Sequence, residues 1–142
     1  MFFLLLFAQA GTLKFTGATD AFAQKISAFS GRGPFAITSI ILWTSAIGSS
    51  ILDNVVLVAA FIPVVQSFQA LGVASQNLWW ALLFGGCLGG NITLVGSTAN
   101  IVALGILEKE KKIKIDFFHW FWIGLAVGLA TTFIVWLVLS VT

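Results

Sequence analysis

The chain has 142 residues, of which 59% are apolar and only 8% are charged, whereas about a quarter of the residues of an average soluble domain are charged. This composition excludes a soluble globular enzyme, a disordered tail and a nucleic-acid-binding protein, which needs basic clusters on a polar surface. Uncharged stretches cover residues 33–52, 54–107 and 117–142, and about 20 apolar residues suffice for a membrane-spanning helix. The sequence therefore predicts an all-α, multi-pass protein of the cell (inner) membrane.

Two short elements are expected at the start of the chain. Residues 1–13 are apolar but too few to cross a membrane, so we expect a partial transmembrane helix that begins partway through a larger architecture. Residues 16–31 are expected to form an interfacial amphipathic helix, with a plain extramembrane loop as the alternative. The apolar residues of this second element recur at helical spacing: Ala18, Phe22, Ile26 and Phe29.

Residues 34–68 consist of two apolar arms on either side of a polar segment at 48–54. Each arm has about 14 residues and is near 21 Å long at 1.5 Å per residue, which is short of the ~30 Å hydrocarbon core. This pattern predicts a re-entrant hairpin with its tip near the middle of the membrane, buried in protein or lining a wet cavity. The alternative is two ordinary helices joined by a loop at 48–54.

Residues 78–107 are apolar at both ends but carry an unusual polar interior. Five glycines, two asparagines, one serine and two threonines lie within residues 85–100. A broken transmembrane helix explains this composition, because an interrupted backbone exposes carbonyls and amides that can bind an ion or substrate. Close helix packing by small residues is the alternative. It accounts for the glycines but not for the polar side chains Asn91, Thr93, Ser97 and Asn100.

The last part of the chain is simpler. Residues 108–116 form a short charged loop with four lysines, and residues 117–141 form one full-length transmembrane helix. Aromatic residues at the start of this helix are typical of a membrane–water interface.

Asp53 is the one charged residue within the apolar part of the chain between the two charged loops. A carboxylate at mid-membrane costs about 2.5–3.5 kcal/mol on insertion scales and usually marks an ion or proton path. Asp53 is therefore expected to be a cation ligand when ionised or a proton carrier when neutral. A purely structural role, in which Asp53 caps the helix that begins near Val55, is the alternative, and the two roles are compatible.

The hairpin tip and the helix break together give the predicted ion- or substrate-binding residues. These are Ser50, Asp53, Asn54, Gly90, Asn91, Thr93, Gly96, Ser97 and Asn100. Asp53 and Asn54 are the candidate ligands of a metal ion, Na⁺, and no cofactor is expected beyond Na⁺ or H⁺ as coupling ion. No nucleophile–base pair or phosphate-binding loop is visible, so we expect neither catalytic residues nor an enzyme.

The two polar segments resemble a known group of proteins. Ile51-Leu52-Asp53-Asn54 with Pro63, and Gly89 to Asn100, are similar to the hairpin and broken-helix motifs of the ion transporter superfamily. The second segment most resembles the arsenite-permease and NhaD-type sodium–proton antiporter branch, which shares a citrate-transporter-like domain. The resemblance implies two inverted repeats, each with a hairpin and a broken helix, with substrate and coupling ion between tip and break.

The chain resembles only the later part of the second repeat. It is therefore expected to be a fragment or a half-size subunit that needs the first repeat or another chain, which includes a homo-oligomer. Membrane lipid and an inorganic ion are the other expected partners, and no nucleic acid is expected.

The hairpin tip departs from the pattern of the sodium–dicarboxylate symporters in the superfamily. Their Ser-Asn-Thr motif falls on Asp53, Asn54 and Val55, so that a carboxylate replaces the first hydroxyl. Because Asp53 would repel a dicarboxylate, the departure favours a cation or proton. We expect part of a secondary active transporter for inorganic ions, by Na⁺/proton antiport or by arsenite or anion efflux. The alternative is a non-transporting membrane subunit or a truncated remnant of such a carrier.

Overall fold

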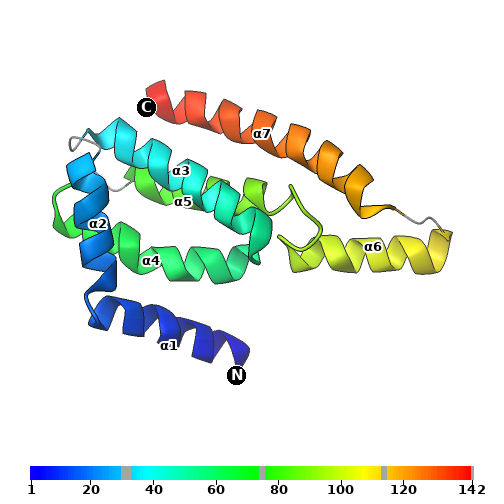
Figure 1. The fold of residues 1–142 in the computed structure, drawn as a ribbon, viewed down its shortest axis with the longest axis horizontal. Helices are drawn as coiled ribbons and strands as arrows, with labels where there is room; N and C mark the ends of the chain where they lie inside the picture. Colours follow the sequence, from blue (N-terminus) through cyan, green and yellow to red (C-terminus); the bar gives the residue numbers. More distant parts are fainter. Residues whose placement is uncertain (30–32, 74–75, 113–114, 142) are drawn as a thin grey trace.

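The computed structural model describes residues 1–29, 33–73, 76–112 and 115–141, and every regular element in these ranges is an α-helix (Figure 1). The helices are α1 (Phe2–Phe15), α2 (Ala18–Phe29), α3 (Pro34–Ile51), α4 (Asn54–Ala70), α5 (Gln76–Gly89), α6 (Thr98–Lys111) and α7 (Phe117–Val141). The expected all-α class is confirmed for the described residues.

Three helices, α3, α4 and α5, form the centre of the bundle. α1 and α2 lie against α4, while α7 lies along α3 and α5. Large apolar side chains between the central helices are fully buried, and burial of each contributes about 1.5–3 kcal/mol. They are Ile37, Ile41 and Leu42 from α3, Val65 and Phe68 from α4, and Leu78 and Leu82 from α5.

Glycines let α3 and α5 approach closely. A Cβ atom on Gly85 would lie 2.5 Å from the carbonyl oxygen of Leu42, and one on Gly89 would lie 2.5 Å from the Cα atom of Ala46. Neither distance is compatible with a real side chain. The alternative explanation of the glycines, close helix packing by small residues, thus applies to these two.

The hairpin arms are longer than the sequence predicts. α3 has 18 residues and α4 has 17, because Gly48, Ser49 and Ser50 continue the helix instead of opening a loop. The tip is reduced to Leu52, whose backbone is extended, and Asp53, the N-cap residue of α4. A serine need not end a helix when its hydroxyl finds an acceptor, and that of Ser50 donates to the carbonyl of Ile47 at 2.6 Å.

Two of the described helices, α3 and α7, are long and apolar enough to cross a membrane by length and composition. α3 reaches this length only because of the extra turn at its C-terminal end. Whether α3 and α4 form a re-entrant hairpin or two full spans therefore stays a prediction.

One face of α2 is buried against α4, and the predicted position of its apolar residues in the membrane interface stays a prediction. Thr19 and Ala23 are buried, whereas Phe22 is 44% exposed. The packing against α4 selects this face. Residues 30 and 31, at the end of the predicted element, lie outside the described residues.

A substitution at Gly89 tests the close approach of α3 and α5. Gly89→Ala should lower the free energy of unfolding by about 1–3 kcal/mol, because its Cβ atom collides with the backbone of Ala46. Thermal unfolding in detergent measures the change.

Gly105 of α6 provides the matched control, since a Cβ atom there meets nothing within 4 Å. Gly105→Ala should leave stability unchanged or raise it by up to about 1 kcal/mol through helix propensity. Equal unfolding temperatures for the two variants would show that the α3–α5 contact is not tight.

Candidate ion-binding site

The carboxylate of Asp53 joins the hairpin tip to the start of α6. Its Oδ1 atom accepts a hydrogen bond from the backbone N–H of Val55 at 3.0 Å. Its Oδ2 atom accepts from the backbone N–H of Thr98 at 3.2 Å and also from the Thr98 hydroxyl. One side chain thus connects two segments that are 45 residues apart in the chain.

Asp53 lies at the N-termini of two helices. It is the N-cap residue of α4, and it also bonds the first residue of α6, whose own N-cap residue Ser97 makes no side-chain capping bond. Each helix N-terminus carries roughly half a positive charge, so two of them favour an ionised carboxylate between them. The expected capping role of Asp53 is therefore present, and it extends to a second helix.

The carboxylate retains room for another partner. An ionised carboxylate offers roughly four acceptor positions, and the bonds described above use three. Asp53 is only half-buried, so the remaining position can be reached by an ion or a proton.

Residues 90–97, the break between α5 and α6, are held by two of the predicted site residues. The Thr93 hydroxyl donates to the carbonyl of Ser50 and accepts from the backbone N–H of Gly96 at 3.0 Å. The amide nitrogen of Asn100 donates to the carbonyls of Gly90 at 3.0 Å and Thr93 at 3.2 Å. Thr93 and the amide nitrogen of Asn100 therefore fix the course of the backbone, whereas the amide oxygen of Asn100 accepts no hydrogen bond within the described residues.

Gly96 sits where the break passes closest to the end of α3. A Cβ atom on Gly96 would lie 2.5 Å from the carbonyl oxygen of Ser49 and 2.8 Å from that of Gly90. Gly90 is similarly confined, because its Cβ atom would lie 3.0 Å from the carbonyl oxygen of Gly96. Both predicted site glycines thus allow close backbone contact and place several carbonyl oxygens near one another.

The break is supported from its other side by α7. A Cβ atom on Gly124 would lie 2.5 Å from the carbonyl oxygen of Ile92 and 2.7 Å from that of Asn91. One turn later, a Cβ atom on Gly128 would meet the side chain of Ile92 at 2.5 Å. The break therefore lies between α3 and α7.

Three predicted side chains are free to bind a ligand. Within the described parts of the chain, Asn54, Asn91 and Ser97 make no side-chain hydrogen bond. Asn54 and Ser97 are the chain neighbours of Asp53 and Thr98, so they flank the bond between tip and break. Ser50 contributes its carbonyl to Thr93, while its hydroxyl bonds within α3.

Sequence reasoning missed Thr98 and Ser49. The Ser49 hydroxyl donates to the carbonyl of Gly86 at 2.6 Å and so ties the end of α3 to α5. Thr98 could have been identified from the sequence, because its hydroxyl lies in the first turn of a helix that follows a glycine-rich break. For Ser49 the run Gly48-Ser49-Ser50 indicated polarity but gave no partner.

The donor set suits a hard monovalent cation. No group of three or more His, Cys, Asp or Glu side chains that could hold a metal occurs among the residues that the structure describes. The coordination shell of a cation at Asp53 would be completed by neutral oxygens, such as those of the Asn54 amide and of carbonyls in the break. Carbonyls of unwound backbone are the ligands that Na⁺ uses in broken-helix transporters.

Comparison with known proteins identifies the family. The protein family described as "Citrate transporter" matches residues 1–141. The chain belongs to this citrate transporter family. The predicted membership of the ion transporter superfamily is confirmed at this coarser level, and membership of a transporter family agrees with the prediction that the chain is not an enzyme.

Relatives in distant organisms share much of the chain. An uncharacterized transporter of Mycobacterium tuberculosis is 38% identical over 112 residues, which is 77% of this chain and 26% of the relative. An uncharacterized transporter of Synechocystis is 30% identical over 99% of this chain and 36% of its own length. The human P protein is 35% identical over 78% of this chain and 14% of its own length. No solved structure matches.

This member of the citrate transporter family thus spans about a third or less of the length of these relatives. The part of this chain that matches the Synechocystis transporter, 99% of its residues, includes both the hairpin tip and the break.

We predict that Thr93→Val loosens the break without unfolding the bundle. The carbonyl of Ser50 and the N–H of Gly96 lose their partner, at a cost of about 1–3 kcal/mol in unfolding free energy. Hydrogen–deuterium exchange should rise in residues 90–97 and stay unchanged in α4.

Thr131→Val is the matched control, because the Thr131 hydroxyl donates only to carbonyls of its own helix, those of Val127 and Gly128. It should leave exchange in residues 90–97 unaltered. Exchange as slow in Thr93→Val as in the control would contradict the role assigned to Thr93.

Proposed function

We propose that the chain forms part of a secondary active transporter that moves inorganic ions across the cell (inner) membrane by Na⁺/proton antiport. The hairpin tip and the break form the ion site. The observation that carries the proposal is the Asp53 carboxylate, which is bonded at once to the tip and to the first residue of α6.

The hydrogen bonds of Asp53 suggest how ion binding is coupled to movement. A proton or Na⁺ that takes the free position of Oδ1 withdraws negative charge from the carboxylate and so weakens the bonds that Oδ2 accepts from Thr98. The two ions therefore exclude each other from one carboxylate, as antiport requires. Each would also weaken the contact between tip and α6, so occupancy of the site changes how firmly the two segments are joined.

A complete transporter needs more than this chain. The relatives are about three to seven times longer than the matched part, and an inverted-repeat architecture places a second hairpin and break opposite the first. We therefore propose that the site acts together with the first repeat, supplied by the same polypeptide, by another chain or by a second copy.

Proton-coupled sodium flux tests the proposal. In vesicles that contain the chain with its first repeat, Asp53→Asn should reduce sodium-driven proton movement to background, because an amide neither binds Na⁺ as strongly nor carries a proton. Asparagine is as good an N-cap as aspartate, so the variant should keep the fold of α4.

Asp20→Asn is the control, since Asp20 is an exposed carboxylate on α2, and it should retain the parental flux. Equal flux in Asp53→Asn and the parent would remove the assigned role of Asp53. No flux in the parent itself would favour a non-transporting subunit or a truncated remnant.

A second candidate function is transport of an anion. The anion could be an organic one such as citrate or an inorganic one such as arsenite. The family description favours citrate, and converging helix N-termini can bind a carboxylate of a substrate. In this chain, however, the carboxylate of Asp53 already occupies that position on α4 and α6.

We therefore expect no saturable uptake of labelled citrate by the parental protein in the same vesicles, and no arsenite efflux. Asp53→Ser, which frees the donors of Thr98 and removes the negative charge, should be the better citrate binder of the two. Saturable citrate uptake by the parent, lost in Thr98→Val, would make anion transport the better proposal.

A further inference from the structure

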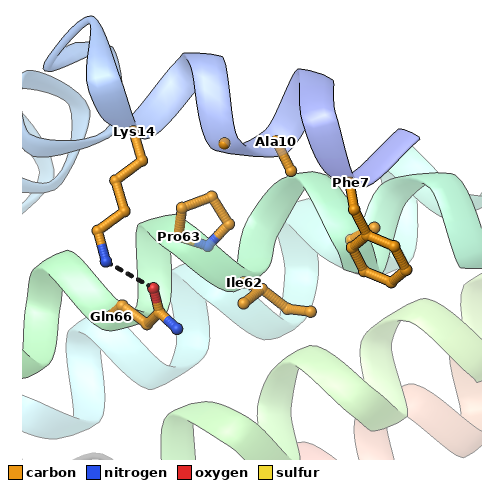
Figure 2. A pocket seen from close by; sticks show the side chains of 8 residues that line it. Phe7, Ala10, Lys14, Ile62, Pro63 and Gln66 are labelled. Atoms are coloured by element: carbon orange, nitrogen blue, oxygen red, sulfur yellow. Dashed lines mark hydrogen bonds between the residues drawn. The ribbon is translucent and has the colours of Figure 1, made fainter. Parts of the chain in front are cut away.

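A groove of about 200 Å³ runs between α1 and α4, outside the ion site. Figure 2 shows its lining from α1 and α4. Most of the lining is apolar, and polar groups gather at one end. The lining residues are Phe7, Ala10, Gly11, Lys14, Ala59, Ile62, Pro63 and Gln66.

The polar end of the groove presents an unneutralised positive charge. The Lys14 ammonium donates to the amide oxygen of Gln66 at 2.8 Å, which fixes the side chain over the groove (Figure 2). An ammonium has three donors, so two remain. Lys14 forms no ion pair within the described parts of the chain, and Gln66 is neutral, so the positive charge is not cancelled.

The groove changes from polar to apolar along its length. Lys14 lies in the last turn of α1, next to α2, whose exposed face carries Asp20, Gln24 and Lys25. In the opposite direction the groove reaches Phe7, beyond which Leu4 and Leu5 are 71% and 57% exposed. A phospholipid has the same order of groups, an anionic headgroup followed by an acyl chain.

We propose that this groove binds an anionic phospholipid. Its phosphate accepts from Lys14, and one acyl chain lies along Pro63, Ile62 and Ala10 toward Phe7. The charge of Lys14 selects an anionic headgroup, because a zwitterionic lipid offers less net attraction to a basic side chain. Gln66 positions the ammonium, and α2 marks the level of the headgroups.

A photoreactive phosphatidylglycerol tests the proposal on the chain together with its first repeat, purified in detergent. Crosslinks mapped by mass spectrometry should lie on α1 and α4 around the groove, and unlabelled phosphatidylglycerol should compete with them better than phosphatidylcholine. Lys14→Gln should weaken binding about fivefold, the effect of one basic side chain at an anionic lipid surface. Lys25→Gln, at an exposed lysine on α2, should bind as the parent does.

A second pair of variants tests the apolar part without changing charge. Gly11 lines the groove, and a Cβ atom there meets nothing within 4 Å, so Gly11→Leu fills the groove without a clash. It should reduce crosslinking as strongly as Lys14→Gln. Gly105→Leu on α6 has equally open surroundings and should not.

Crosslinks elsewhere, or equal binding by Lys14→Gln and Lys25→Gln, would overturn the proposal. So would protein–protein crosslinks between two copies through α1, which would make the occupant a protein segment. None of these measurements depends on transport, so the lipid site and the proposed function can fail separately.

Discussion

The arrangement of both polar segments depends on the bonds of one carboxylate. Asp53 starts α4 through the N–H of Val55 and binds the start of α6 through Thr98. Without this connection α6 would have no side-chain cap, because Ser97 supplies none, and its N-terminal N–H groups would need water or a ligand. The price of an acidic residue in an apolar chain is thus offset by two helix N-termini that favour negative charge.

The helices around this carboxylate provide a rigid frame. α3 ends at the tip and α5 ends at the break, and the two helices are held together by the close contacts at Gly85 and Gly89. The distance between tip and break is therefore determined by backbone contacts that cannot adjust. Gly124 of α7 confines the break from the opposite side. Within this frame, the contact between Asp53 and Thr98 is made by side-chain rotation and hydrogen bonds, which a proton or cation can alter.

Local signals in the sequence lie at several of the helix ends. Pro34 follows an extended Gly33 and starts α3, Asp53 caps α4, and α5 ends at the first of the two glycines after Leu88. Each of these signals acts within a few residues of the helix end. The length of α3 was not predictable in this way. Ser49 and Ser50 resemble a loop in sequence, but their hydroxyls bond to Gly86 and Ile47, and the first of these partners is 37 residues away.

The large separation in sequence between bonded residues also limits what could be inferred about the site. The nine predicted residues do include those at the tip and the break, but their roles depend on partners elsewhere in the chain. Thr93 reaches Ser50, 43 residues away, and Asp53 reaches Thr98. Composition alone could not separate side chains that hold the backbone, such as Thr93 and Asn100, from those left free, such as Asn54 and Ser97. Asn54 and Ser97 are the chain neighbours of Asp53 and Thr98, so the proposed ion site has side chains without a hydrogen bond on both sides of this contact. The hydrogen bonds between Asp53 and Thr98 are side-chain contacts that can change while the glycine contacts hold the rest of the bundle.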